Sequence, residues 1–120
     1  MSPTQRDLQA PIFTVTWDLC VWLLNKTRTQ PHDVLACSLA AEILHRLDTV
    51  TLALKNIDRD TALAEADLLL IRLRLRLRLA VETTFLDDRQ GQYALRLADD
   101  IGRQLGGWHK HLAARAEPTS

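Results

Sequence analysis

Residues 70–80 read LIRLRLRLRLA, an alternation of leucine and arginine that decides the fold of this chain. A period of two is typical of a half-buried β-strand. However, the alternation follows the strong helix formers ALAEA at residues 62–66, and residues 32–90 contain neither glycine nor proline. A β-rich domain needs frequent turns built from those two residues. We therefore predict that this stretch is helical and that the protein is all-α.

On a helix the same alternation separates into four stripes, because successive residues are turned by about 100°. Two apolar stripes lie nearly opposite each other, with a pair of arginines on each flank between them. The four groups are Leu70, Leu73, Leu77 and Ala80; Leu68, Ile71, Leu75 and Leu79; Arg72 and Arg76; Arg74 and Arg78. One apolar stripe fills the core of a monomer and the second remains exposed. An exposed patch of this size predicts a homo-oligomer.

Helix breakers elsewhere divide the 120 residues into four predicted helices, at residues 12–28, 33–55, 60–85 and 88–113. His32 or Asp33 stands near the start of the second helix, and Asn56 is placed for a left-handed C-terminal cap. Asp87 and Gln90 have the spacing of a capping box. Short links make successive helices antiparallel, so residues 11–113 are predicted to form one up-down four-helix bundle. We expect flexible tails at residues 1–10 and 114–120.

The first predicted helix carries more apolar surface than one core can use, whereas the second has a single stripe with Ser38, His45 and Thr49 opposite. One stripe of the first helix contains Trp17 and Cys20. The predicted oligomer interface combines its other stripe with the outer stripe of the third helix: Val15, Leu19, Trp22, Leu23, Leu68, Ile71, Leu75 and Leu79.

The composition excludes several classes of protein. Hydrophobic residues make up 47% of the chain, which is too many for a disordered protein. The longest charge-free apolar stretch, Leu19–Leu24, is far shorter than the roughly 20 residues that span a bilayer. Two cysteines are too few for a disulfide scaffold, so we expect a reduced, cytoplasmic protein.

The pattern of titratable residues does not predict an enzyme. Glu42 and His45 have the spacing of half a di-iron site, but no other glutamate is followed by a histidine in this way. His109 and His111 are turned about 200° apart on a helix, so they cannot share one metal ion. We therefore expect no catalytic residues, no metal site and no cofactor.

Four arginines within seven residues suit phosphate oxygens, which makes nucleic acid a candidate ligand. The alternative is that they pair with acidic residues on the flanks of a two-faced helix. Lys and Arg total 15 and Asp and Glu total 15, and this zero net charge favours the structural alternative. If phosphate is bound, the predicted contacts are Arg72, Arg74, Arg76 and Arg78, with Lys26 and Arg28 at the end of the first helix.

Glycines near the end of the fourth predicted helix indicate a close contact. Gly106 and Gly107 each cost roughly 1 kcal/mol in a helix interior, which another helix in close approach would offset. We therefore predict close helix packing around Gly102, Gly106, Gly107 and Trp108.

Three segments carry a resemblance to a known family: residues 12–18, residues 70–80 and, above all, residues 98–108, ADDIGRQLGGW. Together they resemble the small four-helix-bundle proteins that include Avd, the accessory variability determinant of diversity-generating retroelements. The same superfamily contains bundle proteins encoded in intervening sequences of ribosomal RNA genes. The resemblance covers about residues 11–112.

The resemblance implies a homopentameric barrel of helical bundles and a non-catalytic partner that binds a reverse transcriptase and its template RNA during mutagenic copying at adenines. Family members that bind nucleic acid are markedly basic, whereas this chain is neutral. That difference bears more on direct RNA binding than on binding of the reverse transcriptase. The alternative function is an oligomeric scaffold or adaptor with no nucleic-acid role.

Overall fold

The computed structural model describes residues 10–116, which form four α-helices and the links between them. The helices are α2 (Pro11–Thr27), α3 (Val34–Leu54), α4 (Arg59–Glu82) and α5 (Asp88–Ala116). The all-α class and the number of helices are confirmed. Residues 114–116, expected in the C-terminal tail, belong to α5, whereas residues 1–9 and 117–120 lie outside the described residues.

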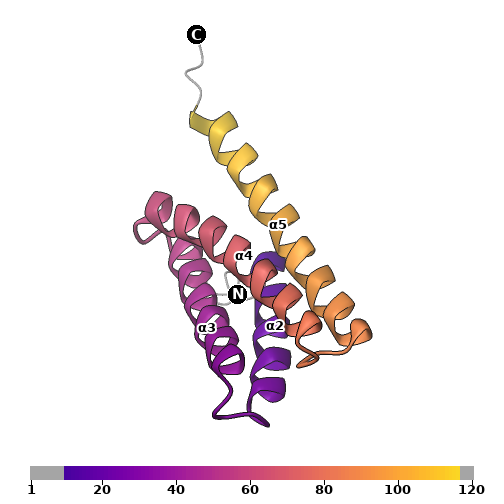
Figure 1. Ribbon diagram of the computed structural model, residues 1–120. Coiled ribbons are helices and arrows are strands. Elements are labelled where there is room, and N and C mark those ends of the chain that lie inside the picture. Colours follow the sequence, from indigo (N-terminus) through magenta and orange to yellow (C-terminus); the bar gives the residue numbers. More distant parts are fainter. Residues whose placement is uncertain (1–9, 117–120) are drawn as a thin grey trace.

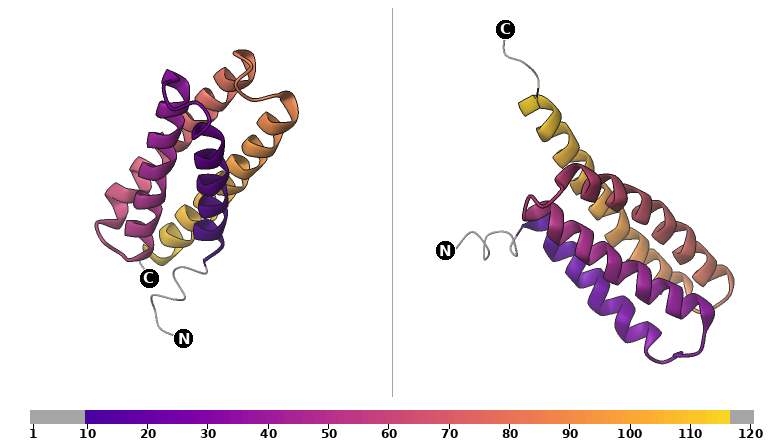
Figure 2. Two further views of the ribbon diagram at one scale, coloured as in Figure 1. Left: turned by 90° about the horizontal axis from the view of Figure 1, so that it is seen from below. Right: turned by 90° about the vertical axis from the view of Figure 1, so that its left-hand side faces the viewer.

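Successive helices run in opposite directions and form a closed ring of contacts (Figures 1 and 2). Each helix packs against the next along the chain, and α5 returns to pack against α2. As a result, α2 and α4 occupy opposite corners of the bundle. The C-terminal end of α5 extends past the other helices (Figure 1). None of the described helices is both long and apolar enough to cross a membrane.

Local hydrogen bonds set the helix boundaries. The carboxylate of Asp33 accepts a hydrogen bond from the Ala36 backbone N–H at 2.8 Å and caps α3. The Gln90 N–H donates to Asp87 at 2.8 Å, while the Asp87 N–H donates to the Gln90 side chain at 3.1 Å. This reciprocal pair is the predicted capping box. Asn56 has φ 58°, the predicted left-handed conformation.

The end of α4 differs from the prediction, because the helix stops at Glu82 rather than at residue 85. Thr84 adopts φ 63°, which turns the chain out of the helix. The backbone N–H of Leu86 then bonds to the carbonyl of Ala80 at 3.0 Å, and the Leu86 side chain is buried. The helix thus ends at a left-handed residue whose N–H bonds to the Val81 carbonyl at 3.1 Å, and an apolar residue beyond the helix packs back on it.

The core lies along the bundle axis and receives side chains from all four helices. Among them are Leu19, Leu23, Leu39, Ile43, Leu73, Leu77, Ala98, Ile101 and Leu105. The predicted inner stripe of α4 is buried, which confirms the orientation assigned to residues 70–80.

The predicted orientation of α2 is corrected by the structure. Val15, Leu19 and Leu23, expected at an oligomer interface, are buried in the core of the chain itself. The inner side of α2 is centred near Thr16, whose hydroxyl donates to the carbonyl of Ile12 at 2.7 Å. Because its hydroxyl is bonded within the helix, Thr16 is buried at little cost. The buried side of α2 therefore coincides with neither of the two apolar stripes predicted from the sequence.

The inner side of α3 contains the only fully buried charged side chain in the described part of the chain, Arg46. Thr49, predicted to lie on the outer side, is buried next to it, and its hydroxyl donates to the Arg46 carbonyl at 2.9 Å. One guanidinium nitrogen of Arg46, Nη1, donates to the carbonyl of Ala66 on α4 at 2.6 Å. Arg46 thus links α3 to α4 from inside the core.

Candidate interaction face

The outward side of α4 is an exposed apolar surface, as predicted. Leu68, Ile71, Leu75 and Leu79 expose 56%, 65%, 60% and 47% of their surface. We call these four residues the outer face of α4. Adjacent leucines on the same helix are buried, so α4 is apolar on two opposite sides, and only the inner side packs within the chain. An apolar surface of this kind marks an interaction site in soluble proteins.

The flank of α4 that faces α3 is a polar contact between helices. Arg76 donates from Nε to the hydroxyl of Ser38 at 2.7 Å and lies 3.6 Å from the carboxylate of Glu42. In the first half of α4, the carboxylate of Glu65 lies 2.9 Å from the ring of His45 on α3. Arg76 therefore has a structural role in the α3–α4 contact.

The flank of α4 that faces α5 is built in the same way. Arg74 forms an ion pair with Asp99 at 3.0 Å. Nearer the start of α4, Asp67 and the ring of His109 lie 2.9 Å apart. Both pairs are partly exposed to solvent, so each contributes little to stability; they line the contact between α4 and α5.

The remaining two arginines of the run are exposed and form no ion pair with any described residue. These are Arg72, on the α3 side of the outer face, and Arg78, on the α5 side. The arginine run therefore divides into two residues that hold helices together and two whose guanidinium groups face solvent. Within this run, Arg72 and Arg78 are the two cations that remain available to a partner.

A groove continues from the outer face toward the end of the bundle. It lies between the first turns of α3 and the last turns of α4 and has a volume of about 910 Å³. Leu75 and Leu79 belong both to the groove and to the outer face. The other apolar lining comes from Val34, Leu35 and Phe85. The exposed apolar surface is therefore wider than α4 alone.

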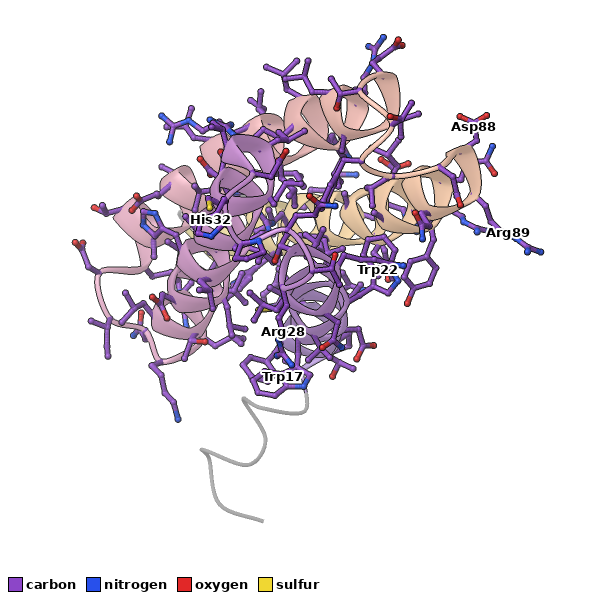
Figure 3. All side chains as sticks on the ribbon, turned by 60° about the horizontal axis from the view of Figure 1, so that its bottom comes forward. Trp17, Trp22, Arg28, His32, Asp88 and Arg89 are labelled. Carbon is purple, nitrogen blue, oxygen red and sulfur yellow. The ribbon has the colours of Figure 1, made fainter. Side chains whose placement is uncertain are left out.

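Lys26 and Arg28, the other predicted phosphate contacts, are not brought to this face. Both are on or just after α2, at the corner of the bundle opposite α4. The Lys26 ammonium lies 5.7 Å from the centre of the Trp22 ring, which in turn packs against Tyr93 of α5 at 5.2 Å between ring centres. Figure 3 shows Arg28 beside α2. The six predicted cations thus do not form one continuous patch.

A smaller apolar patch lies on the outward side of α2. Trp17 and Val21 are exposed, and the Phe13 ring stacks on Trp17 at 5.9 Å between centres. We call these three residues the α2 outer patch. In Figure 3 Trp17 points away from the other helices, whereas Trp22 is turned toward α5. Trp22, predicted at the oligomer interface, is therefore partly enclosed within the chain.

The predicted close packing at the glycines holds at one position. A Cβ atom added to Gly102 would lie 2.9 Å from Nη2 of Arg74 and 3.3 Å from the side chain of Leu70, so α4 and α5 approach closely there. Gly106 and Gly107 have no neighbour within 4 Å of such an atom. The prediction for these two was wrong within the chain, because this part of α5 lies toward its projecting end.

Trp108 packs on the α3–α4 turn. The guanidinium of Arg59 lies 5.6 Å from the centre of the Trp108 ring and donates from Nε to the carbonyl of Ala53 at 3.1 Å. Arg59 thus connects the end of α3 to α5 through a cation–π contact. Trp108 has a structural contact within the chain.

Within residues 10–116 no group of three or more His, Cys, Asp or Glu side chains is placed to hold a metal ion. Glu42 and His45 each pair with a residue of α4 instead. Comparison with known proteins gave no match to a protein family, a curated protein or a solved structure.

Proposed function

We propose that this protein is a non-catalytic accessory subunit of a diversity-generating retroelement. It acts in the cytoplasm as a homopentamer, binds the reverse transcriptase and its template RNA, and supports mutagenic reverse transcription. The observation that carries the proposal is the outer face of α4, an exposed apolar surface flanked by the unpaired Arg72 and Arg78. A protein that works by binding needs such a surface and needs no catalytic group.

Two features support a role in a ribonucleoprotein. The resemblance of residues 98–108 to Avd-like proteins connects the chain to retroelements and to ribosomal RNA genes. In addition, a ring of five copies would repeat Arg72 and Arg78 five times. Repetition of weak phosphate contacts on one assembly raises the overall affinity for a long RNA well above that of one copy.

The second candidate is an oligomeric scaffold or adaptor without a nucleic-acid role. Two observations favour it: the net charge of zero, and the ion pairs that engage Arg74 and Arg76 within the chain. Under this alternative the outer face serves only to join protein chains, and Arg72 and Arg78 keep that face soluble.

An RNA titration at several salt concentrations separates the two candidates. The test variant is the double substitution Arg72→Gln and Arg78→Gln, and the matched control is Arg89→Gln and Arg96→Gln, which removes the same charge from exposed positions of α5. The ligand is the template RNA transcribed next to the gene. If the proposal holds, the test variant binds more weakly than the control. The slope of log affinity against log salt also falls by about 0.7 to 0.9 for each phosphate that the variant no longer neutralises.

Equal affinity of the test and control variants would contradict phosphate binding by α4. If the test variant also dissociates into smaller species under those conditions, Arg72 and Arg78 are interface residues and the scaffold function is favoured. Absence of RNA binding by the unaltered protein at low salt would exclude the RNA part of the proposal.

A further inference from the structure

We propose that the outer face of α4 in one copy packs against the α2 outer patch of the next copy, in a head-to-tail contact. This inference rests on the self-assembly part of the proposed function and names the surfaces that would carry it. The partner for the outer face is therefore a second copy of this chain, presented through Phe13, Trp17 and Val21.

The positions of the two surfaces favour a head-to-tail contact. Since α2 and α4 occupy opposite corners of the bundle, their outward sides point in opposite directions. A two-fold dimer in which both surfaces are covered at once is therefore excluded. Any contact between α4 of one copy and α2 of another leaves a free α2 patch at one end and a free outer face at the other. The contact therefore propagates, and it gives a ring when the rotation between successive copies closes.

Charge distinguishes this contact from a symmetric contact between two outer faces. An α4–α4 contact would place Arg72 and Arg78 of both copies along one seam, four cations against the two exposed Glu82 carboxylates, one from each copy. The α2 outer patch instead adjoins Asp18, which is exposed and has no ion-pair partner among the described residues. Burying like charges together is unfavourable, whereas an acid facing these arginines supports the contact.

The two surfaces also match in length and in composition. At about 1.5 Å per residue, the outer face extends roughly 16 Å along α4, and the α2 outer patch extends roughly 12 Å. The patch offers the stacked rings of Phe13 and Trp17, and the outer face offers branched aliphatic side chains with a groove beside them. Tryptophan is among the residue types most enriched where a few side chains dominate the binding energy of an interface.

The test uses one variant for each surface. Ile71→Asp disrupts the outer face, and Trp17→Asp disrupts the α2 outer patch; both side chains are exposed, so the fold is expected to survive. Gln92→Asp, at an exposed position of α5, is the matched control. Circular dichroism and thermal unfolding verify the fold of each variant. Leu75→Asp and Val21→Asp replace either variant that fails to fold.

Sedimentation velocity of each variant alone and of an equimolar mixture gives the decisive result. The unaltered protein and the control should form the same large assembly. Each variant alone should be monomeric, with self-association weakened at least roughly tenfold, as expected for loss of a central interface side chain. Mixed together, the variants should form a heterodimer and nothing larger, because one intact outer face meets one intact α2 patch and the other two surfaces both carry aspartate.

Two results would overturn the inference. If Trp17→Asp still assembles on its own, the outer face pairs with something other than α2. If the mixture remains monomeric although the unaltered protein assembles, the contact is not head-to-tail, while self-assembly itself stands. If the unaltered protein is a monomer, both the ring and this contact are excluded. RNA binding is tested independently by the salt titration.

Discussion

Replacing Arg46 by methionine should stabilise the folded chain. The Arg46 side chain is 0% exposed, and its Nε and Nη2 atoms have no hydrogen-bond partner among the described residues. Burial lowers the pKa of the guanidinium to about 10, an effect that nearby Asp67 opposes and nearby Arg74 reinforces. The folded chain therefore holds the Arg46 guanidinium in a buried site that disfavours its charged form.

The size of the effect follows from this pKa and from the hydrogen bond that methionine cannot make. At about 1.4 kcal/mol per pKa unit, the lowering corresponds to roughly 3 kcal/mol of unfavourable burial. Methionine fills a similar space, but it gives up the hydrogen bond to the Ala66 carbonyl, worth about 1 kcal/mol. We therefore expect Arg46→Met to raise the free energy of unfolding by about 2 kcal/mol, a typical value when a buried ion is replaced by an apolar residue.

Urea unfolding followed by circular dichroism, at equal chain concentrations, measures this change. Arg46→Lys is the control, because lysine keeps a polar, titratable amine in the core but is too compact to reproduce the guanidinium hydrogen bond; it should be no more stable than the unaltered chain. A decrease of about 1 kcal/mol or more in Arg46→Met would refute the reasoning, since it would mean that the guanidinium is fully bonded in the folded state.

The gain in stability from Arg46→Met should depend on pH. Above about pH 10 the folded chain releases the Arg46 proton while the unfolded chain still binds it, so stability of the unaltered protein rises with pH. The advantage of Arg46→Met should therefore shrink above about pH 10. Titration of Cys20, whose thiol pKa is raised by burial and by Asp48, is common to both proteins and cancels from the difference. A constant difference between about pH 7 and pH 11 would contradict this assignment.

Three further predictions concern packing. In the Trp17→Asp variant, which is expected to be monomeric, Leu73→Ala should lower the free energy of unfolding by about 2 to 4 kcal/mol, whereas Leu75→Ala should change it by less than about 0.5 kcal/mol; equal decreases in urea unfolding would contradict the two-sided α4. Gly106→Ala should raise the thermal midpoint, with a gain of about 0.5 to 1 kcal/mol, because a methyl group meets open space there. Gly102→Ala should gain less, since it must displace the end of the Arg74 side chain, and equal gains would argue against close packing. A thiol reagent should modify the exposed Cys37 well before the buried Cys20, and equal rates would show that the core opens readily.

The orientation of α4 could be predicted from the sequence because its polar and apolar residues leave only one consistent arrangement on a helix. Four arginines on the two flanks force the leucines onto two opposite sides. The capping box of Asp87 and Gln90 was also predictable, because these residues are only three positions apart. At the start of α3 the sequence left His32 or Asp33, and the structure shows that Asp33 is the cap. Features that depend only on local spacing can be predicted from a single sequence.

The inner sides of α2 and α3 were harder to predict because each contains a buried polar residue. The buried positions of α3 include Ala36, Leu39, Ile43, Arg46, Val50 and Ala53, which follow the alternating three- and four-residue spacing of a heptad. A prediction from hydrophobicity alone would leave Arg46 out of the buried series, although its position has the spacing of that series. In α2 the buried Thr16 has the same effect.

Which arginines remain free could not be predicted, because it depends on the register between helices. Arg74 meets Asp99 on α5, and Arg76 meets Ser38 and Glu42 on α3. These partners are 25 to 38 residues away in the chain, so their proximity follows only from the packed bundle. The α2 outer patch could not be predicted either, because the side of α2 that faces outward also depends on how the helices pack.

The most direct test of the central claim is the mass of the unaltered protein, measured by light scattering during size exclusion with and without the reverse transcriptase encoded nearest to its gene. We predict a species of five chains that shifts to a larger complex when the enzyme is added. A monomer at all concentrations, unaffected by the enzyme, would contradict the claim that the outer face of α4 is an interaction surface.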